Sequence, residues 1–569
     1  MSISPSTSPA AGIDVAIQPG TEDYPGIKIA PDDKSWDLAP YGHIEALVVN
    51  TGAKPLSISL RVDDNGDWRD NPWDAESLYL QPGAVGTVKV IFGYSYGLKP
   101  GYRLKSNAVT ELLLFAGKSV DQQSFRVESI KAAGVAGEMP PVDPDAVRTK
   151  PVDDRLLATK ITLATQGASA TSSQSGIKVL FSASAREQSV SIKPAIGRWD
   201  LRDDMQVRIH VQNSGHTPIT PRARVESDGG ASDWVDVNTL SPGTHADIIV
   251  PFAGATTAQI GKEGTGSRIT SDSISAVTIA ATNPEQGATL EVGSLRADSP
   301  NITLPSWLGK RPPIDGAWVK TLDDEFDGAT LNRSLWRVDG PNYWDKQSHW
   351  SKDEVVLDKG AVALVSEKKR GFNDDNPAEK ETAYAAGYLH TYNLWAQRYG
   401  YFEARMKLPR APGLWPAFWL MPDRGPSAGD QGKRQDTGNG GMEFDIMEHL
   451  TRWGPHRYNI AMHYDGYGKD HKSVGSDKIY VQPDKNGYIT CGLLWTPGLA
   501  VYYCNGKEVL RWENARISNV PEILMFTLPQ GGWDNSPVDD TLLPDRFVID
   551  YVRVWQRKDL ASAADRPVK

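Results

Sequence analysis

Three carboxylates lie close together in an apolar stretch near the C-terminal end of the sequence. Glu443, Asp445 and Glu448 are separated only by Phe, Ile and Met, with Met442 before them. Burying acids in such surroundings is costly unless they line a cleft and take part in chemistry. Two carboxyl groups about 5 to 5.5 Å apart can cleave a glycosidic bond with retention of configuration, one as nucleophile and the other as general acid/base.

A bulged β-strand would bring the three acids into one row. On a regular strand Glu443 and Asp445 share one face, whereas Glu448 falls on the other. One extra residue, absorbed as a β-bulge at 446–447, returns Glu448 to the acidic face, and bulges are frequent beside active sites. We therefore predict a bulged strand over these residues.

Two other interpretations of the acids remain open. They could form the solvent-facing side of a strand, or they could bind a metal ion. Ligands drawn only from Asp and Glu favour hard cations, but no glycine-bearing loop of the EF-hand type surrounds them. In a hydrolase, Glu443 must be ionised and Glu448 must begin protonated. Repulsion between neighbouring carboxylates separates the pKa values of the cluster, so that one acid can be ionised while another keeps its proton.

The run from Glu443 to Glu448 resembles the active-site signature of glycoside hydrolase family 16, which includes laminarinases, agarases, carrageenases and porphyranases. The resemblance implies a β-jelly-roll of two curved antiparallel sheets and a retaining mechanism. Glu443 would be the nucleophile, Glu448 the general acid/base, and Asp445 the residue that holds the nucleophile. Five further motifs in the family's order extend the resemblance over residues 305–558: 324–326, 399–405, 413–420, 494–497 and 547–555.

Aromatic residues near these motifs are candidates for sugar binding, because indole rings stack on the C–H faces of sugars. Most Trp in a β-sandwich are core residues, and we expect this of Trp495 and Trp555. The family resemblance adds a cleft histidine, His463. The predicted substrate-binding residues are Trp344, Trp415, Trp419, His463, Trp533 and Arg410.

The resemblance also implies a structural calcium ion on the convex side of the jelly roll. Its ligands would be Glu325, the carbonyl of Gly360, and Asp550, all oxygen ligands as calcium prefers. We expect no cofactor for catalysis.

The two cysteines, Cys491 and Cys504, could be cross-strand neighbours. If Pro497 and Gly498 form the centre of a tight hairpin, the two cysteines face each other at disulfide distance. An L-Pro-Gly turn fits a two-residue hairpin poorly, so the register could slip.

Length and charge limit the alternatives. A chain of 569 residues needs several domains, and a net charge of −10 without a basic stripe argues against nucleic acid as a partner. No stretch of about 18 apolar residues exists, so we expect no membrane span.

The N-terminus lacks the regions of a secretory signal. Since a polysaccharide cannot enter a cell, we expect an extracellular or periplasmic protein whose signal was removed or whose export uses another route. We expect a monomer.

Before residue 300 the sequence contains a duplication. Trp36-Asp37-Leu38 recurs as Trp199-Asp200-Leu201, and Asn50-Thr-Gly52 recurs as Asn213-Ser-Gly215, both at an offset of 163. Later matches have an offset of 160. Short Val-, Ile- and Thr-rich runs between turn residues indicate β-sandwiches. We therefore predict an all-β chain with three domains: a β-sandwich over 1–140, a related sandwich over 155–298, and the catalytic jelly roll over 305–558.

The two N-terminal domains resemble carbohydrate-binding-like sandwiches found in front of agarose-degrading enzymes. Trp68 and Tyr94 make sugar binding more plausible for the first copy than for the second. The alternative is that both are spacers that stiffen or shield the enzyme.

Two features favour a red-algal galactan of the agar, furcellaran or carrageenan type as the substrate of an endo-acting enzyme. The first is this N-terminal resemblance, and the second is an insertion over 424–439 whose cations could bind sulfate esters. The alternatives are a laminarinase-like β-1,3- or mixed-linkage glucanase, a transglycosylase, and a non-hydrolytic polysaccharide-binding protein. The cations considered are Arg410, Lys433, Arg434, Arg452, Lys469, His471 and Lys472.

Overall fold

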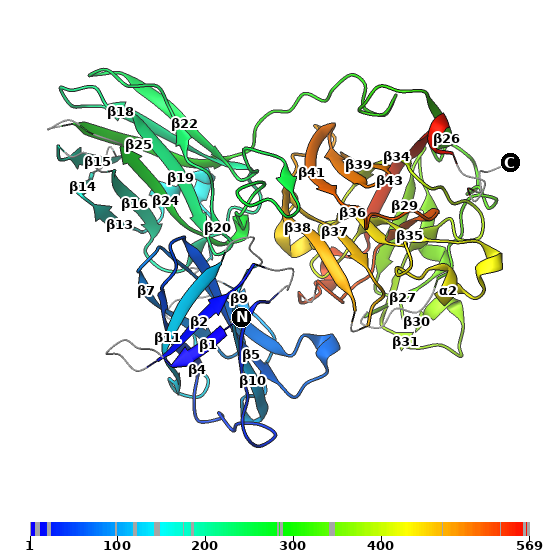
Figure 1. Cartoon of the computed structure of the whole chain (residues 1–569), viewed down its shortest axis with the longest axis horizontal. Coiled ribbons are helices and arrows are strands. Elements are labelled where there is room, and N and C mark those ends of the chain that lie inside the picture. The colour runs from blue at the N-terminus through cyan, green and yellow to red at the C-terminus, as the bar shows by residue number, and fades with distance from the viewer. Residues whose placement is uncertain are drawn as a thin grey trace. The chain divides into compact units, whose positions relative to one another are not determined.

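The chain is all-β, and its computed structural model forms two compact units (Figure 1). Unit 1 comprises residues 1–255 and 267–300, and unit 2 comprises residues 256–266 and 301–569. None of the helices among the described residues has the length and apolarity needed to cross a membrane. The structure describes residues 2–5, 12–19, 24–96, 99–117, 122–140, 148–173, 176–183, 187–281, 284, 288–340, 347–468, 470–534, 536–561 and 565.

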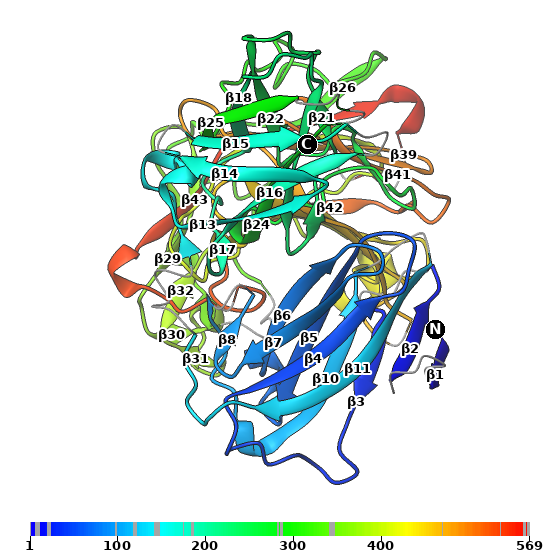
Figure 2. The same cartoon turned by 90° about the vertical axis from the view of Figure 1, so that its left-hand side faces the viewer.

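Unit 1 begins with a sandwich of two antiparallel sheets, drawn in blue in Figure 2. Alternating apolar residues of both sheets meet in one core that includes Val48, Leu60 and Leu114. The first sheet has the order β1 (Ser2–Pro5), β2 (Ile13–Ile17), β11 (Gln123–Ala133), β4 (His43–Asn50), β7 (Val85–Ile91). The second has the order β3 (Gly26–Ile29), β10 (Val109–Ala116), β5 (Leu56–Asp64), β6 (Trp73–Leu80). A small ribbon pairs β8 (Tyr94–Ser95) with β9 (Lys99–Pro100).

The rest of unit 1 repeats this plan. One sheet has the order β14 (Ala168–Ser173), β15 (Gly176–Phe181), β25 (Thr289–Asp298), β18 (Gln206–Asn213), β22 (His245–Pro251). The other contains β12 (Arg148–Thr149), β17 (Arg198–Trp199), β24 (Ile274–Ala281), β16 (Gln188–Pro194) and β13 (Ile161–Gln166), with β19 (Pro221–Ser227) on β24 and the short β20 (Gly230–Ala231) and β21 (Val235–Asp236) on β19.

The same asparagine turn occurs in both sandwiches. Asn50 donates from its side-chain amide to the carbonyls of Lys54 and Leu80 and accepts from the Gly52 N–H. Asn213 makes the corresponding bonds to Thr217, Leu240 and Gly215. The offsets are again 163 near the asparagine and 160 at the distant carbonyl. The duplicated sequence therefore encodes one hydrogen-bonded turn that closes β4 in one copy and β18 in the other.

Unit 2 contains two large sheets, and most of their strand pairs are antiparallel. The larger has the order β23 (Ala258–Gln259), β41 (Lys507–Glu513), β40 (Leu499–Cys504), β39 (Ile489–Thr496), β34 (Gly400–Lys407), β43 (Asp545–Arg557), β29 (Val362–Glu367), β32 (Tyr384–Ala386), β27 (Ser348–Trp350), with β26 (Trp318–Asp324) on β43 and β28 (Val355–Leu357) on β29. The smaller has the order β33 (Tyr388–His390), β42 (Glu522–Thr527), β35 (Ala417–Pro422), β36 (Glu443–Glu448), β37 (Arg457–Tyr464), β38 (Lys472–Tyr480). A separate ribbon pairs β30 (Gly371–Phe372) with β31 (Glu381–Thr382).

The core of unit 2 lies between these two sheets, as in a jelly roll. Phe402 and Trp495 from the larger sheet and Phe418, Phe444 and Phe526 from the smaller belong to one buried cluster. Phe418 and Phe526 stack with ring centroids 4.7 Å apart. The prediction that Trp495 packs in the core is confirmed, and Trp555 is buried in a second cluster with Tyr401.

The predicted domain boundaries stay predictions, and the chain has one feature that they do not include. Residues 256–266 belong to unit 2, although the residues on both sides belong to unit 1. Within this segment β23 pairs in parallel with β41, so that Ala258 faces Leu510. Unit 2 is therefore not one continuous piece of sequence.

Cys491 and Cys504 face each other across the β39–β40 hairpin, so the predicted register is confirmed. Their Sγ atoms lie 3.3 Å apart, both residues are buried, and both are free thiols in this structure.

Replacing Asn213 by alanine should destabilise the second sandwich. The change removes two donated hydrogen bonds from a fully buried amide and leaves two carbonyls unsatisfied. We expect a loss of about 1–3 kcal/mol in the free energy of unfolding, measured by denaturation of the whole chain. The exposed neighbour Ser214 provides a control as Ser214→Ala. Equal effects of the two changes would contradict the structural role of the asparagine.

Candidate active site

The three acids lie on β36, in the middle of the smaller sheet of unit 2. Glu443 faces His463 and Glu448 faces Asn459 on β37, and the register shifts between Asp445 and Glu448. The pairing with β35 shifts at the same place. The predicted bulge at 446–447 is therefore confirmed.

The bulge separates the apolar residues from the acids. Phe444, Ile446 and Met447 all belong to the buried core between the sheets. Two successive residues on the core side are what a classic bulge produces. Consequently the acids can share the opposite face, where Asp445 is the direct neighbour of Trp419 on β35.

Burial raises the pKa of every acid in this row. The charge of Glu448 raises the pKa of Glu443 further. Burial raises the pKa of Glu448 to about 7 and that of Asp445 well above its ordinary value. At neutral pH the row therefore keeps more than one proton. A protonated Asp445 can donate to Glu443, and this hydrogen bond lowers the pKa of Glu443.

Two side chains orient Glu448. The indole N–H of Trp415 donates to Oε1 at 3.0 Å, and the amide of Asn459 donates to Oε2 at 2.7 Å. Both bonds favour the charged form and lower the pKa that burial raises. The result is a carboxyl group poised to change its protonation state near neutral pH, as a general acid/base requires.

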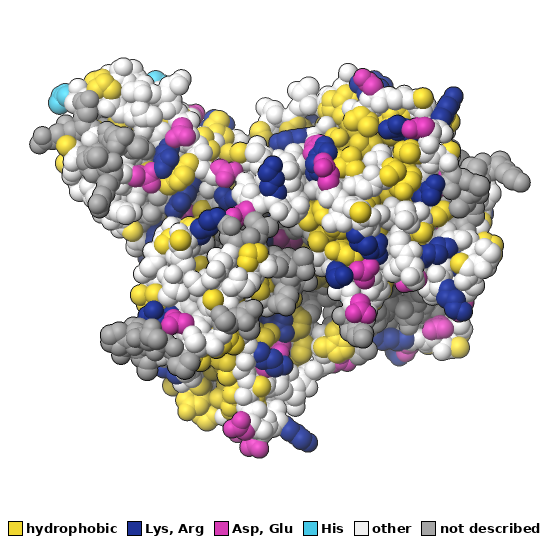
Figure 3. Space-filling view, in the orientation of Figure 1, with side chains coloured by type: hydrophobic (Ala, Val, Ile, Leu, Met, Phe, Trp, Pro, Cys, Tyr) yellow, Lys and Arg dark blue, Asp and Glu magenta, His cyan; other side chains and the backbone are white. Residues whose placement is uncertain are grey.

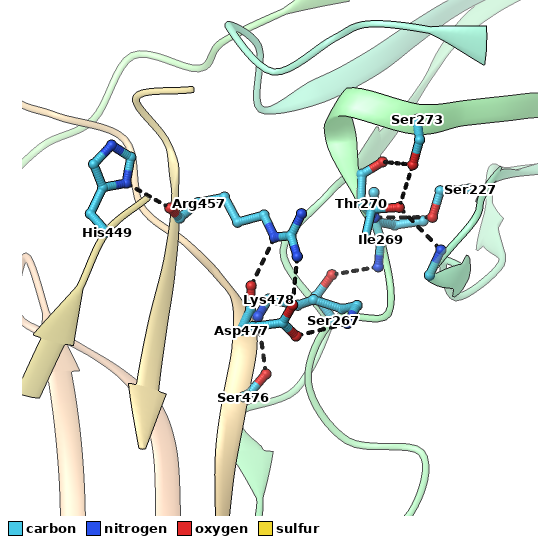
Figure 4. Close-up of polar contacts among 11 residues, drawn as sticks. Ser227, Ser267, Ile269, Thr270, Ser273, His449, Arg457, Ser476, Asp477 and Lys478 are labelled. Atoms are coloured by element: carbon cyan, nitrogen blue, oxygen red, sulfur yellow. Dashed lines mark hydrogen bonds and ion pairs between the residues drawn. The ribbon is translucent and has the colours of Figure 1, made fainter. Parts of the chain in front are cut away.

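Residues after the bulge anchor the end of β36 to β37 and β38 (Figure 4). Burial lowers the pKa of His449 to about 4, so its ring is neutral and Nδ1 donates to the carbonyl of Arg457 at 3.0 Å. The Arg457 guanidinium donates to the carbonyl of Asp477 at 2.8 Å and to its carboxylate at 2.6 Å. These bonds keep the strand next to Glu448 in place.

A loop between β37 and β38 reaches the nucleophile candidate. The hydroxyl of Tyr467 donates to Glu443 Oε2. The loop is anchored at Asp465, whose carboxylate accepts from Arg516 at 2.8 Å and from Lys472 at 3.0 Å. An anchored tyrosine at this position can orient the carboxylate for attack.

His463 and His471 form a pair beside Asp445. His463 Nε2 lies 3.4 Å from Asp445 Oδ2, and its Nδ1 lies 3.0 Å from His471 Nε2. The two imidazole rings are nearly parallel, with centroids 5.2 Å apart. The predicted cleft histidine is thus in direct contact with the acidic row.

The predicted aromatic residues lie at different distances from the acids. Trp415 contacts Glu448 directly, and Trp419 lies beside Asp445 but is 93% buried. Trp533 packs edge-on against Trp415, with ring centroids 6.0 Å apart, and is half-buried. Trp344 lies outside the described residues.

Two of the cations proposed to bind sulfate are paired with acids within the protein. Arg434 is buried and donates twice to Asp423, at 2.8 and 2.9 Å. Lys472 pairs with Asp465, as described above. Arg410 is exposed, but only its backbone N–H is fixed, by Asp545. On the face seen in Figure 3, acidic and basic side chains are interspersed. Lys433 is exposed, and Lys469 lies outside the described residues.

The predicted calcium ligands do not fit a cation site. Arg553 donates to both carboxylate oxygens of Glu325 at 2.8 Å. Arg405 donates to Asp550 at 2.7 Å. Each carboxylate thus already has a fixed guanidinium counter-ion, which a calcium ion would have to displace. The sequence shows the acids but not their arginine partners.

Two residues of the site were not predicted. Asn459 shares its strand face with His463, four positions later, and this alternation was a usable signal. Tyr467 lies in a loop, where no periodicity indicates its direction. Only the closeness of the loop to His463 in sequence pointed to it.

Comparison with known proteins assigns this site to a family. The model described as glycosyl hydrolases family 16 matches residues 343–553, which include the whole acidic row. The chain contains a family 16 glycosyl hydrolase domain. The earlier resemblance is confirmed for this part of the chain, whereas the carbohydrate-binding-like character of the N-terminal sandwiches stays a prediction.

Relatives of the family 16 domain include bacterial β-glucanases. The chain is 28% identical over 268 residues to the endo-1,3-1,4-beta-glycanase EglC of Rhizobium meliloti (strain 1021), covering 42% of this chain and 51% of EglC. It is 26% identical to a beta-glucanase of Rhodothermus marinus, covering 42% of this chain and 85% of that relative. Among solved structures, SCLam, a non-specific endo-beta-1,3(4)-glucanase, is 23% identical with a TM-score of 0.36, covering 46% of this chain and 95% of SCLam.

The relatives do not support the galactan substrate favoured by the sequence, and the glucanase alternative fits them better. The internal pairing of Arg434 and Lys472 also weakens the argument for a sulfated galactan. Their charges are visible in the sequence, but they are neutralised by Asp423 and Asp465 in the fold.

Trp415→Phe should move the alkaline limb of the pH profile upward. With Glu448 as the predicted general acid, activity is expected below the raised pKa of this group and should be lost as the pH rises through about 7. Removing the indole donor while keeping a ring raises this pKa further, by up to about one unit. The profile of kcat/KM on a soluble β-glucan measures the shift. Trp453→Phe is the matched control, since Trp453 packs on Trp533 at 5.3 Å. A shift to lower pH, or the same shift in both variants, would contradict the assignment.

Proposed function

We propose that the chain is a retaining endo-type β-glucanase acting on β-1,3-linked or mixed-linkage glucan. The observation that carries the proposal is the bulged row of Glu443, Asp445 and Glu448 inside a family 16 domain. The β-glucanase relatives support the choice of glucan.

In the proposed mechanism Glu448 acts first as the acid. It gives its proton to the leaving glycosidic oxygen while Glu443 attacks the anomeric carbon from the opposite side, which gives a covalent glycosyl-enzyme. Water then hydrolyses the intermediate, and the Glu448 carboxylate takes up the proton of that water. The pKa of about 7 suits Glu448 for both steps.

Neighbouring side chains support the two charges at different moments. The Trp415 and Asn459 donors stabilise Glu448 after it has lost its proton. Asp445 and Tyr467 can donate to Glu443 and stabilise its charge before the attack. Because both sets of donors are held by the sheet or by an anchored loop, little rearrangement is needed during the reaction.

The setting of the enzyme and the role of unit 1 are also proposals. Since the substrate is a polymer, we propose that the enzyme acts outside the cytoplasm and as a monomer. Sugar binding by the first sandwich is supported by Trp68, which is 56% exposed, and by the half-buried Tyr94.

The first test is the release of reducing ends from laminarin, mixed-linkage glucan, agarose, porphyran, furcellaran and carrageenans. We expect release from one or both glucans and its fall by about 10³-fold or more in Glu443→Gln. The exposed Glu379 serves as control in Glu379→Gln. Release from a galactan alone would overturn the choice of glucan but not the site.

Azide rescue assigns the two roles. With azide and a substrate bearing a good leaving group, Glu448→Gly should give a glycosyl azide of retained configuration, since the intermediate on Glu443 still forms. Glu443→Gly should give the inverted azide by direct attack. NMR of the anomeric proton distinguishes the products, and the reverse pattern would exchange the two roles.

A further inference from the structure

We propose that the nucleophile side of the acidic row is a binding site for a divalent transition cation of the zinc class. The ligands are Glu443, Asp445 and His463, each of which offers one ligand atom within 4.8 Å of the other two. The sequence had suggested ligands from Asp and Glu only. The fold adds an imidazole nitrogen from β37, and the mixed set suits zinc better than a hard cation.

One oxygen in this group lacks a hydrogen-bond partner. Asp445 is 97% buried, and its Oδ2 accepts no hydrogen bond from any described residue. The same atom lies 3.4 Å from His463 Nε2. A buried carboxylate oxygen without a donor is costly, and a bound cation would satisfy it.

His463 is oriented as a metal ligand requires. Its Nδ1 is 3.0 Å from His471 Nε2, so Nδ1–H can donate to His471, and the unprotonated Nε2, which lies 3.4 Å from Asp445 Oδ2, can bind a cation. Ligand histidines in zinc sites usually make such a second bond, which fixes the ring and the tautomer. The parallel stacking of the two rings restricts the orientation further.

Binding at this place has a direct consequence for catalysis. The cation would occupy the carboxylate of Glu443 and displace the Tyr467 hydroxyl that now bonds to it. Zinc and substrate would therefore exclude each other, and the ion would be a reversible inhibitor of the proposed hydrolysis. The binding itself does not depend on the proposed function and is measured without substrate.

Calorimetric titration of the full chain with zinc chloride tests the site. We expect one zinc ion per chain at this site, with Kd raised at least about 10-fold in both His463→Ala and Asp445→Asn, and about 10-fold in His471→Ala. His210→Ala is the matched control, because His210 lies 2.8 Å from Asp247 on unit 1 and is a similar histidine–aspartate pair elsewhere in the chain. This control should bind zinc like the original protein.

Circular dichroism of each variant shows that it is folded before binding is compared. No saturable binding to the original protein at millimolar zinc would overturn the proposal. Equal affinity of the original protein and the folded His463→Ala and Asp445→Asn variants would also overturn it, as would loss of the same ion in His210→Ala.

With substrate present, the site predicts inhibition that rises with zinc, falls with increasing substrate, and is reversed by a chelator. If zinc binds at the site but hydrolysis is absent under all conditions, the metal site stands and the proposed function fails. If hydrolysis occurs without zinc binding, the opposite holds.

Discussion

The single extra residue in β36 is the constraint on which the rest of the site depends. Without it, Glu448 would point into the core between the sheets, where Phe444 and Phe526 now pack. A carboxylate cannot be accommodated there without a large cost in free energy. The bulge instead places Met447 in the core and Glu448 among donors. One local irregularity therefore satisfies packing and chemistry together.

Different neighbouring side chains stabilise the charges at the two ends of the acidic row. Neutral donors serve Glu448, namely an indole and an amide, whereas a phenol and an imidazole pair lie on the side of Glu443 and Asp445. No arginine or lysine is paired with these acids among the described residues. A nearby cation would keep the acids ionised and abolish the raised pKa of Glu448. Arg405, Arg434 and Arg553 of this unit are instead paired with other carboxylates.

Features that depend on the alternation of side chains along a β-strand, or on the position of a turn, could be predicted from the sequence. Alternation predicted the face of Asp445 and the bulge, and a hairpin centred on Pro497 and Gly498 predicted the register that brings Cys491 opposite Cys504. The duplication that contains Asn50 and Asn213 also followed from spacing, whereas the turn that each asparagine closes did not. Prediction failed where the partner of a charge had to be known: Arg434 seemed available for a sulfate ester, and Glu325 for calcium. The sequence shows which charged residues are present, but only the fold shows which of them are already paired with an opposite charge.

The return of residues 256–266 to unit 2 affects any attempt to produce that unit separately. A gene fragment starting near residue 301 would contain every strand of both large sheets except β23. The outer edge of β41 would then present unpaired backbone groups at Leu510 and Arg511, where β23 pairs now. Exposed strand edges promote association between chains. Poor solubility of such a fragment would result from the exposed edge of β41. The strand that carries the three acids would still be intact.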